Sequence, residues 1–300
     1  MGLLGRVRNR ANIAFEGVTN AAQAGPHVDL DRKLQILLMQ QYRQMAAAAA
    51  APIPFTDVEF SSYSQNGEDG ILLYLFSIIG SGGKRAVEIG AGDGVECNSA
   101  NLVINHGWNA LLLDGDPTNI AKGRAHYARR TGAWRLRRLP PTLVQAWISA
   151  ENINPLIEDH GFSGEVDLLS IDIDGMDYWI LQALTCVSAR VLVVEFNNRW
   201  SADQTVTVPY SKTFVGDGVL GEDAGYFGAS LSAFAKLGRD RGYRLIGVNG
   251  PATNAFLLRE GVGEDRFPAV TVESCLATDY ARHQVRTKGA ALAGREVVLV

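Results

Sequence analysis

The sequence predicts an α/β fold built around a largely parallel sheet, and three observations support this. Residues 84–117 place two short apolar runs on either side of a glycine cluster and a segment compatible with a helix. Residues 166–171 are almost continuously apolar, as in a central parallel strand that is covered on both faces. Residues 243–248 and 254–259 flank a turn-rich NGPAT segment, which predicts a β-hairpin. At 300 residues and 47% hydrophobic, the chain has room for one large domain and an extension.

Composition excludes several classes of protein. The net charge of −4 gives no electrostatic basis for binding nucleic acid. Cys97, Cys186 and Cys275 are far apart and match neither a zinc site nor a disulfide framework, so we expect a reducing, cytoplasmic location. No apolar run approaches the roughly 18 residues of a membrane span, and the basic start lacks the apolar core of a secretory signal.

The first 54 residues are predicted to be an N-terminal helical extension and linker, followed by the main domain over residues 55–300. Residues 4–18 have the pattern of a basic amphipathic helix, which either contacts a membrane surface or packs on its own domain. Residues 30–45 carry a stronger apolar stripe. We expect that stripe to pack either on a second subunit, giving a homodimer, or on the main domain.

The main domain opens with the polar segment SQNGEDG at residues 64–70, followed by an apolar helix at residues 71–79. Ser64 or Asn66 could cap this helix. Ligand contact by Gln65 or Glu68 is the alternative interpretation of the same segment.

A strand at residues 86–89 then meets Gly90, Gly92 and Gly94, and glycines at a βα turn let the backbone approach a ligand closely. A second strand, residues 110–113, ends in Asp114. Nucleotide-binding α/β folds place a carboxylate for ribose hydroxyls at about this distance from the turn.

The spacing of the glycines helps to choose the ligand. A dinucleotide fingerprint reads G-x-G-x-x-G, whereas the glycines here run G-x-G-x-G, with Glu88 before them and Asp93 among them. Two carboxylates would repel a diphosphate and suit a ligand with a cationic end, such as the ammonium and sulfonium groups of S-adenosylmethionine. An ordinary βα turn without a ligand is the alternative.

Beyond the glycine turn, residues 117–130 are predicted to be a helix and residues 134–138 a third strand. Residues 142–150 and 155–160 are predicted to be helical. The loop between them, residues 151–154, lies where the edge of a bound adenine could be recognised.

The strand at residues 166–171 runs out into Asp172, Asp174 and Asp177, at the edge where open α/β sheets bind ligands. Three like charges so close together are costly unless a cation, hydrogen bonds or raised pKa values relieve them. For Asp177 the alternative is a cap on the helix at residues 178–184.

The next strand, residues 190–194, ends in Glu195, with Asn197 and Asn198 close behind. Two neighbouring strands therefore deliver oxygen-bearing side chains to one edge. The polar segment of residues 199–225, which contains Tyr210, is too long for a simple connection and is predicted to cover a substrate.

Taken together, these segments resemble the class I S-adenosylmethionine-dependent methyltransferases, and within them the FkbM-like family. The resemblance spans about residues 60–260. Its motifs are SQNGEDG (64–70), VEIGAGDG (87–94), LLSIDIDGMDY (168–178) and YFGASL (226–231), with the closing hairpin.

The resemblance implies a Rossmann-like, mostly parallel sheet of seven strands, with helices on both faces and a reversed last strand that forms the hairpin. It also implies a methyl donor over the turn between Gly90 and Gly94, with Glu88 near its methionine end and Asp114 on its ribose. Gln65, Asp93 and Asp172 are assigned to the same donor site. FkbM-like enzymes typically methylate hydroxyl groups of sugars and related natural products.

The run at residues 167–174 also resembles metal-dependent O-methyltransferases, in which the position matching Asp172 holds a divalent cation. Those enzymes carry an Asp-Asn pair after the next strand, whereas this chain has Asn197-Asn198 preceded by Glu195. The predicted metal ligands for Mg²⁺ or Mn²⁺ are accordingly Asp172, Glu195 and Asn197.

The leading hypothesis is methyl transfer to a hydroxyl of a small molecule or glycan, with Asp172, Asp174 and Glu195 as catalytic residues. Asn197, Asn198 and Tyr210 are the predicted substrate-binding residues. The alternatives are an N-methyltransferase with the same donor site and a binding module that has lost its chemistry. A nicotinamide oxidoreductase is disfavoured by the glycine spacing.

Overall fold

The protein is described by a computed structural model covering residues 27–131, 140–214 and 225–300. The chain divides into two compact units, residues 1–50 and 51–300. The segments predicted as a basic helix (4–18) and as a third strand (134–138) lie outside the described residues.

The described part of the first unit is the helix α2 (His27–Ala47). Leu30, Leu34 and Leu37 recur along one side of it and remain 53–60% exposed. Contact of this unit with a second subunit or a membrane surface therefore stays a prediction. Among the described helices, none combines the length and the apolar character needed to cross a membrane.

The second unit contains the predicted seven-stranded sheet, in the order β3-β2-β1-β4-β5-β8-β7. Adjacent strands from β3 to β5 are parallel, whereas β8 is antiparallel to both of its neighbours. The closing hairpin is thus confirmed. The strands are β1 (Arg85–Ile89), β2 (Asn109–Asp114), β3 (Thr142–Gln145), β4 (Gly164–Ile171), β5 (Val187–Glu195), β7 (Tyr243–Val248) and β8 (Asn254–Arg259).

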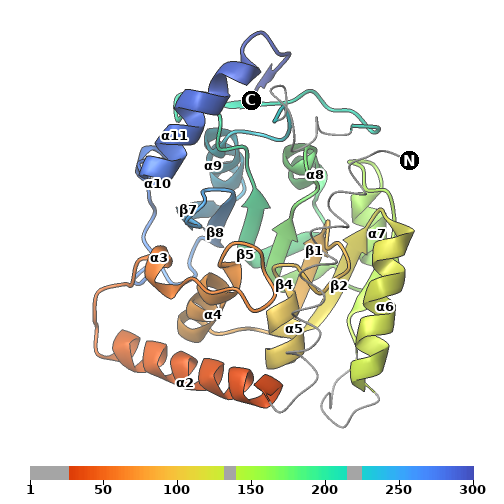
Figure 1. Ribbon diagram of the computed structural model, residues 1–300, viewed down its shortest axis with the longest axis vertical. Helices are drawn as coiled ribbons and strands as arrows, with labels where there is room; N and C mark the ends of the chain where they lie inside the picture. Colours follow the sequence, from red (N-terminus) through yellow and green to blue (C-terminus); the bar gives the residue numbers. More distant parts are fainter. Residues whose placement is uncertain (1–26, 132–139, 215–224) are drawn as a thin grey trace. The chain divides into compact units, whose positions relative to one another are not determined.

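Helices cover both faces of this sheet (Figure 1). The larger core lies on one face, where alternate strand residues such as Leu169 and Ile171 pack with residues of α7, α8 and α9, for example Phe234. Because the other face is buried as well, Leu168 is also fully enclosed, which explains the unbroken apolar run in β4. The helices are α3 (Phe55–Val58), α4 (Glu68–Ile79), α5 (Ala100–His106), α6 (Pro117–Thr131), α7 (Ile153–Asp159), α8 (Asp177–Ala183), α9 (Leu231–Asp240), α10 (Val272–Cys275) and α11 (Asp279–Lys288), with the 3-10 helix η1 (Gly289–Leu292).

One predicted element is wrong. Residues 142–150 were expected to be helical, but Thr142–Gln145 forms β3 and pairs with β2 from Leu111 to Asp114. The segment follows a Pro-Pro pair and is only four residues long, so its own pattern is too short to identify a strand. The segment is a strand because it pairs with the buried strand β2.

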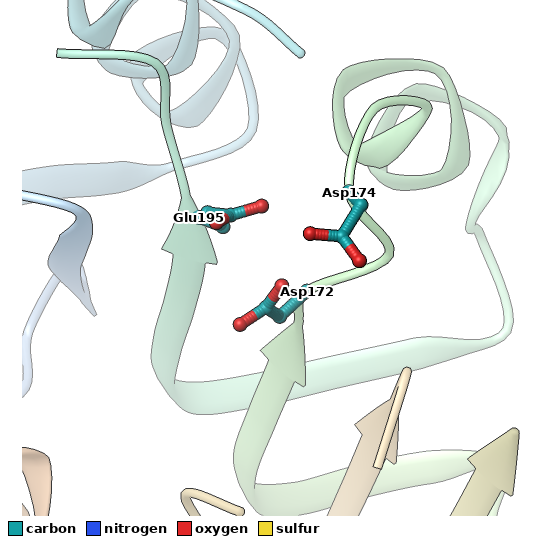
Figure 2. A group of neighbouring side chains, drawn as sticks. All are labelled: Asp172, Asp174 and Glu195. Atoms are coloured by element: carbon teal, nitrogen blue, oxygen red, sulfur yellow. The ribbon is translucent and has the colours of Figure 1, made fainter. Parts of the chain in front are cut away.

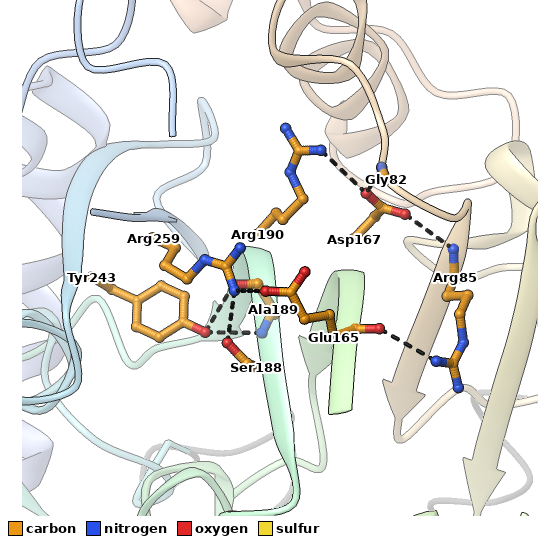
Figure 3. A network of polar contacts seen from close by, with 9 residues as sticks. All are labelled: Gly82, Arg85, Glu165, Asp167, Ser188, Ala189, Arg190, Tyr243 and Arg259. Atoms are coloured by element: carbon orange, nitrogen blue, oxygen red, sulfur yellow. Dashed lines mark hydrogen bonds and ion pairs between the residues drawn. The ribbon is translucent and has the colours of Figure 1, made fainter. Parts of the chain in front are cut away.

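Polar contacts fix the amino-terminal edge of the sheet, opposite the acidic strand ends (Figure 3). The Asp167 carboxylate accepts hydrogen bonds from the backbone N–H groups of Gly82 and Gly83, at 2.5 and 2.9 Å. Arg190 lies 3.7 Å from the same carboxylate. Asp167 is therefore a structural residue that holds the loop before β1, although it opens the run of residues 167–174 that resembles metal-dependent O-methyltransferases.

The segment after β5 is joined to residues far along the chain. Its short strand β6 (Val206–Thr207) pairs with β9 (Val298–Leu299), and Tyr226 donates a hydrogen bond to the carbonyl of Glu296. Val206 of β6 also forms a small apolar cluster with Trp200 and Leu292. Residues beyond 261 thus support the segment that follows β5, a contact that no pattern in the sequence predicts.

Candidate active site

The glycine turn brings the ends of three strands together. Gly90 has a φ of 85°, and its N–H group donates to the carbonyl of Leu113 at 2.9 Å. A Cβ atom on Gly90 would lie 1.7 Å from the backbone oxygen of Asp172. Only glycine permits both the backbone conformation and this approach, so the turn lies directly beside the acidic end of β4.

The other end of the turn leaves space for a ligand. Gly92 also has a positive φ, of 56°, and a Cβ atom there would meet nothing within 4 Å. Its N–H group donates to Asp114 Oδ2 at 2.9 Å, while Asp114 Oδ1 accepts from the N–H group of Asp116 at 2.8 Å. Burial raises the pKa of Asp114, and these hydrogen bonds oppose that effect. The predicted ribose-binding carboxylate is therefore at the turn, as the sequence suggests.

Glu88 is held by hydrogen bonds within the protein. It is 3% exposed, and its two carboxylate oxygens accept from the backbone N–H groups of Asn98 and Ser99, each at 2.8 Å. The hydroxyl of Ser99 donates to it as well. Glu88 therefore holds the residues just before α5, and its place near the methionine end of a donor stays a prediction.

Asp93 and Gln65 are engaged within the protein too. Asp93 Oδ1 accepts from the N–H groups of Val95 and Glu96, at 2.9 and 3.3 Å, and so shapes the glycine loop. Gln65 Nε2 donates to Glu96 Oε1 at 2.7 Å. These contacts bring the SQNGEDG segment next to the glycine loop.

Glu68 and Asp69 in that segment are both buried, and Gly67, not Ser64 or Asn66, is the N-cap residue of α4. Glu68 Oε1 accepts from the side-chain amides of Asn249 and Asn254, each at 2.8 Å. The segment is thereby tied to the closing hairpin. Ligand contact by Glu68 is disfavoured because its carboxylate is enclosed and hydrogen-bonded.

The three predicted catalytic residues come together. Asp172 and Asp174 follow β4 and Glu195 ends β5, and one oxygen of each lies within 4.8 Å of the others (Figure 2). Asp172 and Glu195 are partly buried, whereas Asp174 is exposed. We refer to these three residues as the carboxylate cluster.

The electrostatics of the carboxylate cluster are unusual. Burial, followed by repulsion from Asp177 and Asp174, raises the pKa of Asp172 to about 8. Burial and the charge of Asp172 raise the pKa of Glu195 well above its usual value. Carboxyl groups this close cannot all ionise without a compensating charge.

Asp177 does not belong to the cluster. Its oxygens accept from the N–H groups of Ile173 and Gly175, at 2.8 and 2.9 Å, and Met176 occupies the cap position of α8. The predicted N-cap role of Asp177 is thus wrong, since the side chain binds the turn that precedes its helix. This turn presents Asp174, whose φ is 57°.

The side chains of the predicted substrate-binding residues Asn197 and Asn198 make hydrogen bonds within the protein. Asn197 is 1% exposed, and its amide donates to the carbonyls of Gly225 and Phe227 while its oxygen accepts from the N–H group of Arg199. Asn198 donates to the carbonyl of Pro251 at 3.1 Å. Both side chains anchor loops, and the assignment of Asn197 as a metal ligand stays a prediction.

Tyr210 lies in a segment that crosses from β5 to the loop after β3. Its hydroxyl donates to Glu151 Oε2 at 2.7 Å, and Lys212 lies 3.1 Å from Glu151 Oε1. Trp147 Nε1 donates to the carbonyl of Lys212 at 2.6 Å. We call residues 208–214 the strap, because they join the two sides of the carboxyl edge.

The strap also contacts the turn that carries Asp174. A Cβ atom on Gly175 would lie 2.3 Å from the ring of Phe214, and the N–H group of Ser211 lies 3.4 Å from Met176 Sδ. Sequence reasoning missed Phe214 and Trp147. The signal available for Trp147 is an aromatic residue just past a strand end, and it is hidden because the sequence pattern predicts a helix there.

Comparisons with known proteins give structural likeness only. No protein-family model and no curated protein matches the chain. A magnesium protoporphyrin IX methyltransferase from Synechocystis, solved with bound S-adenosylmethionine, is 11% identical with a TM-score of 0.41, covering 64% of this chain and 78% of that one. A methyltransferase from Clostridium acetobutylicum is 12% identical with a TM-score of 0.40, covering 74% and 97%.

The mitomycin 7-O-methyltransferase MmcR is 19% identical with a TM-score of 0.35, covering 74% of this chain and 54% of its own. Likeness of this degree assigns no activity. Any function must therefore be argued from the residues of the site.

Proposed function

We propose that the protein is an S-adenosylmethionine-dependent methyltransferase that acts on a hydroxyl of a sugar, glycan or related natural product. The observation that carries this proposal is the contact between the glycine turn and the end of β4. Because a Cβ on Gly90 would meet the backbone oxygen of Asp172 at 1.7 Å, a ligand on the turn is adjacent to the carboxylate cluster.

The turn has features that fit the donor. Gly92 leaves open space above the backbone, and Asp114 offers a carboxylate beside it. A ribose hydroxyl can donate to Asp114 in the way that the N–H group of Gly92 does in the structure. The acidic surroundings favour a cationic sulfonium over a diphosphate. When bound, S-adenosylmethionine supplies an electrophilic methyl group.

The carboxylate cluster supplies the other half of the reaction. An alcohol is a weak nucleophile near neutral pH, so a neighbouring group must accept its proton as its oxygen bonds to the methyl carbon. The carbon–sulfur bond breaks and its electron pair remains on sulfur, giving an ether, S-adenosylhomocysteine and one proton. Asp174, or Asp172 after it has lost the proton that its raised pKa holds, accepts that proton, and Glu195 helps to hold the acceptor.

A divalent cation such as Mg²⁺ or Mn²⁺ would perform the same task by lowering the pKa of the hydroxyl. Asp172 and Glu195 remain candidate ligands, whereas the hydrogen bonds of Asn197 oppose its assignment. The donor set is all oxygen, as these hard cations require.

The test has two parts. Calorimetric titration with S-adenosylhomocysteine should show one binding site per chain, and donor labelled in its methyl group should transfer label to a hydroxyl-bearing acceptor in glycan extracts. Lack of S-adenosylhomocysteine binding would favour a binding module without this chemistry. Transfer of label to amines, but not to alcohols, would identify an N-methyltransferase.

A further inference from the structure

Trp147 lies where the end of β2 meets the strap. Its indole ring packs beside Gly115, since a Cβ atom on Gly115 would lie 3.2 Å from Cε3 of that ring. Gly115 directly follows Asp114, whose carboxylate accepts a hydrogen bond from the glycine turn. The indole N–H group of Trp147 donates to the carbonyl of Lys212 in the strap at 2.6 Å. One side chain therefore contacts both the proposed donor side and the strap.

The ring of Trp147 is held in place and yet is 58% exposed. A large aromatic ring gains much of its binding free energy from being covered by a ligand. The contact with Gly115 and the hydrogen bond to Lys212 restrict the orientation of the indole, so a ligand that covers it pays little conformational entropy. A ribose on Asp114 would bring the rest of the donor next to Gly115 and so to this ring.

The two ends of the strap are held with different strength. At the end near α8, Val208 is fully buried, and its carbonyl accepts a hydrogen bond from Trp179 Nε1 at 2.8 Å. At the other end, Lys212 and Glu151 form an ion pair between side chains that are 62% and 50% exposed. Exposed ion pairs contribute little to stability, because water screens both charges. The hydrogen bond from Trp147 therefore matters more at this end than it would in a firmly packed segment.

We propose that Trp147 is a positioning residue that couples the donor site to the strap. Donor bound on the glycine turn covers the exposed ring, and the indole N–H group then holds the strap at Lys212. The strap in turn shapes the acceptor side, because Phe214 packs against Gly175, next to Asp174. This role rests on the proposed function, since it requires a donor on the glycine turn. The acceptor side is accordingly completed only after the donor has bound.

Hydrogen exchange of the full chain, with and without S-adenosylhomocysteine, tests the coupling without requiring an acceptor. Amide exchange in peptides that cover residues 208–214 is followed by mass spectrometry. Trp147→Phe keeps an aromatic ring beside Gly115 but removes the N–H donor. Trp179→Phe is the matched control, because it removes the same kind of hydrogen bond from the other end of the strap.

Saturation with S-adenosylhomocysteine should slow exchange in the strap about threefold or more in the parent protein. In Trp147→Phe the ligand should still bind, with its affinity lowered by no more than about the same factor, but it should no longer slow exchange in the strap. Trp179→Phe should exchange faster in both states and retain the effect of the ligand. Thermal melting monitors the folding of each variant.

Trp147→Ala tests the contact between the ring and the donor. It should weaken S-adenosylhomocysteine binding about tenfold, and the smaller loss in Trp147→Phe would show that an aromatic ring is sufficient for this contact. An affinity unchanged in Trp147→Ala would overturn the proposal.

The coupling would also be overturned if exchange in the strap were the same with and without bound ligand. A ligand effect that persists in Trp147→Phe, or that disappears equally in Trp147→Phe and Trp179→Phe, would overturn it too. Calorimetry on the parent separates this result from the proposed function. Failure to bind S-adenosylhomocysteine would remove both proposals, whereas binding without an effect on the strap would remove only the coupling.

Discussion

Gly90 and Asp172 are in backbone contact: a Cβ atom on Gly90 would lie 1.7 Å from the carbonyl oxygen of Asp172. The same carbonyl belongs to the residue that begins the carboxylate cluster. The turn proposed to bind the donor and the acids proposed to serve the acceptor are therefore parts of one rigid junction. Several measurements can test this arrangement.

Gly90→Ala should destabilise the protein by more than about 2 kcal/mol, because the added methyl group collides with backbone and φ is positive. Gly161→Ala is a matched control: its φ is also positive, at 73°, but its Cβ would meet nothing within 4 Å. The control should cost about 1 kcal/mol. Urea unfolding measures both. Similar losses in the two variants would show that the contact with Asp172 is unimportant.

Asp172→Asn should reduce turnover by about 10² or more while leaving the affinity for S-adenosylhomocysteine nearly unchanged. The amide keeps the shape of the side chain but cannot accept the proton of the hydroxyl or compensate a cation in the same way. Methyl-transfer rates at saturating substrate, together with calorimetry, measure the two effects. Unchanged turnover would remove Asp172 from the mechanism.

Asp69 should make stability depend on pH. Burial raises its pKa to about 7 in the folded protein, although hydrogen bonds from three backbone N–H groups to its Oδ2 act to lower the pKa. Between pH 4 and pH 7 the folded state then holds a proton that the unfolded state releases, so the free energy of unfolding falls as pH rises, by up to about 1.4 kcal/mol per unit.

Asp69→Asn should remove the part of this pH dependence of the free energy of unfolding that comes from one proton. Urea unfolding of the parent and the variant at several pH values between 4 and 8 measures it. Identical slopes would mean that Asp69 is ionised in the folded protein throughout this range.

Tyr210→Phe should weaken the strap, since its hydroxyl donates to Glu151 and accepts from the N–H group of Ala150 at 3.0 Å. We expect the KM for the acceptor to rise about two- to tenfold, with the affinity for S-adenosylhomocysteine changed less. Steady-state kinetics with both substrates measure this. An unchanged KM for the acceptor would show that the strap does not shape the acceptor side.

The sheet could be predicted because its signals are local. Residues 166–171 are apolar without alternation since both faces of β4 are buried, and the turn residues of the hairpin are contiguous. The third strand could not be predicted in the same way. Thr142–Gln145 is defined by its pairing with β2, and no periodicity can appear in four residues.

The sequence predicts where the site lies better than it predicts the role of each residue in it. Strand ends locate Asp172, Asp174 and Glu195, because parallel neighbours deliver their last residues to one edge. The roles of Glu88 and Asn197 depend on hydrogen bonds to residues up to thirty positions away, such as Phe227. A sequence pattern identifies a carboxylate or an amide but does not say whether its oxygens are already occupied.

The pairing of β6 with β9 bears on the order in which the protein is completed during translation. Thr207 cannot pair until Val298, 91 residues later in the chain (298 − 207), has been synthesised. A nascent chain emerging from the ribosome can assemble the glycine turn and the parallel strands long before this partner exists. The segment after β5 is thus completed among the last parts of the protein, and a half-made chain would carry the glycine turn, proposed to bind the donor, without the support that β9 gives this segment.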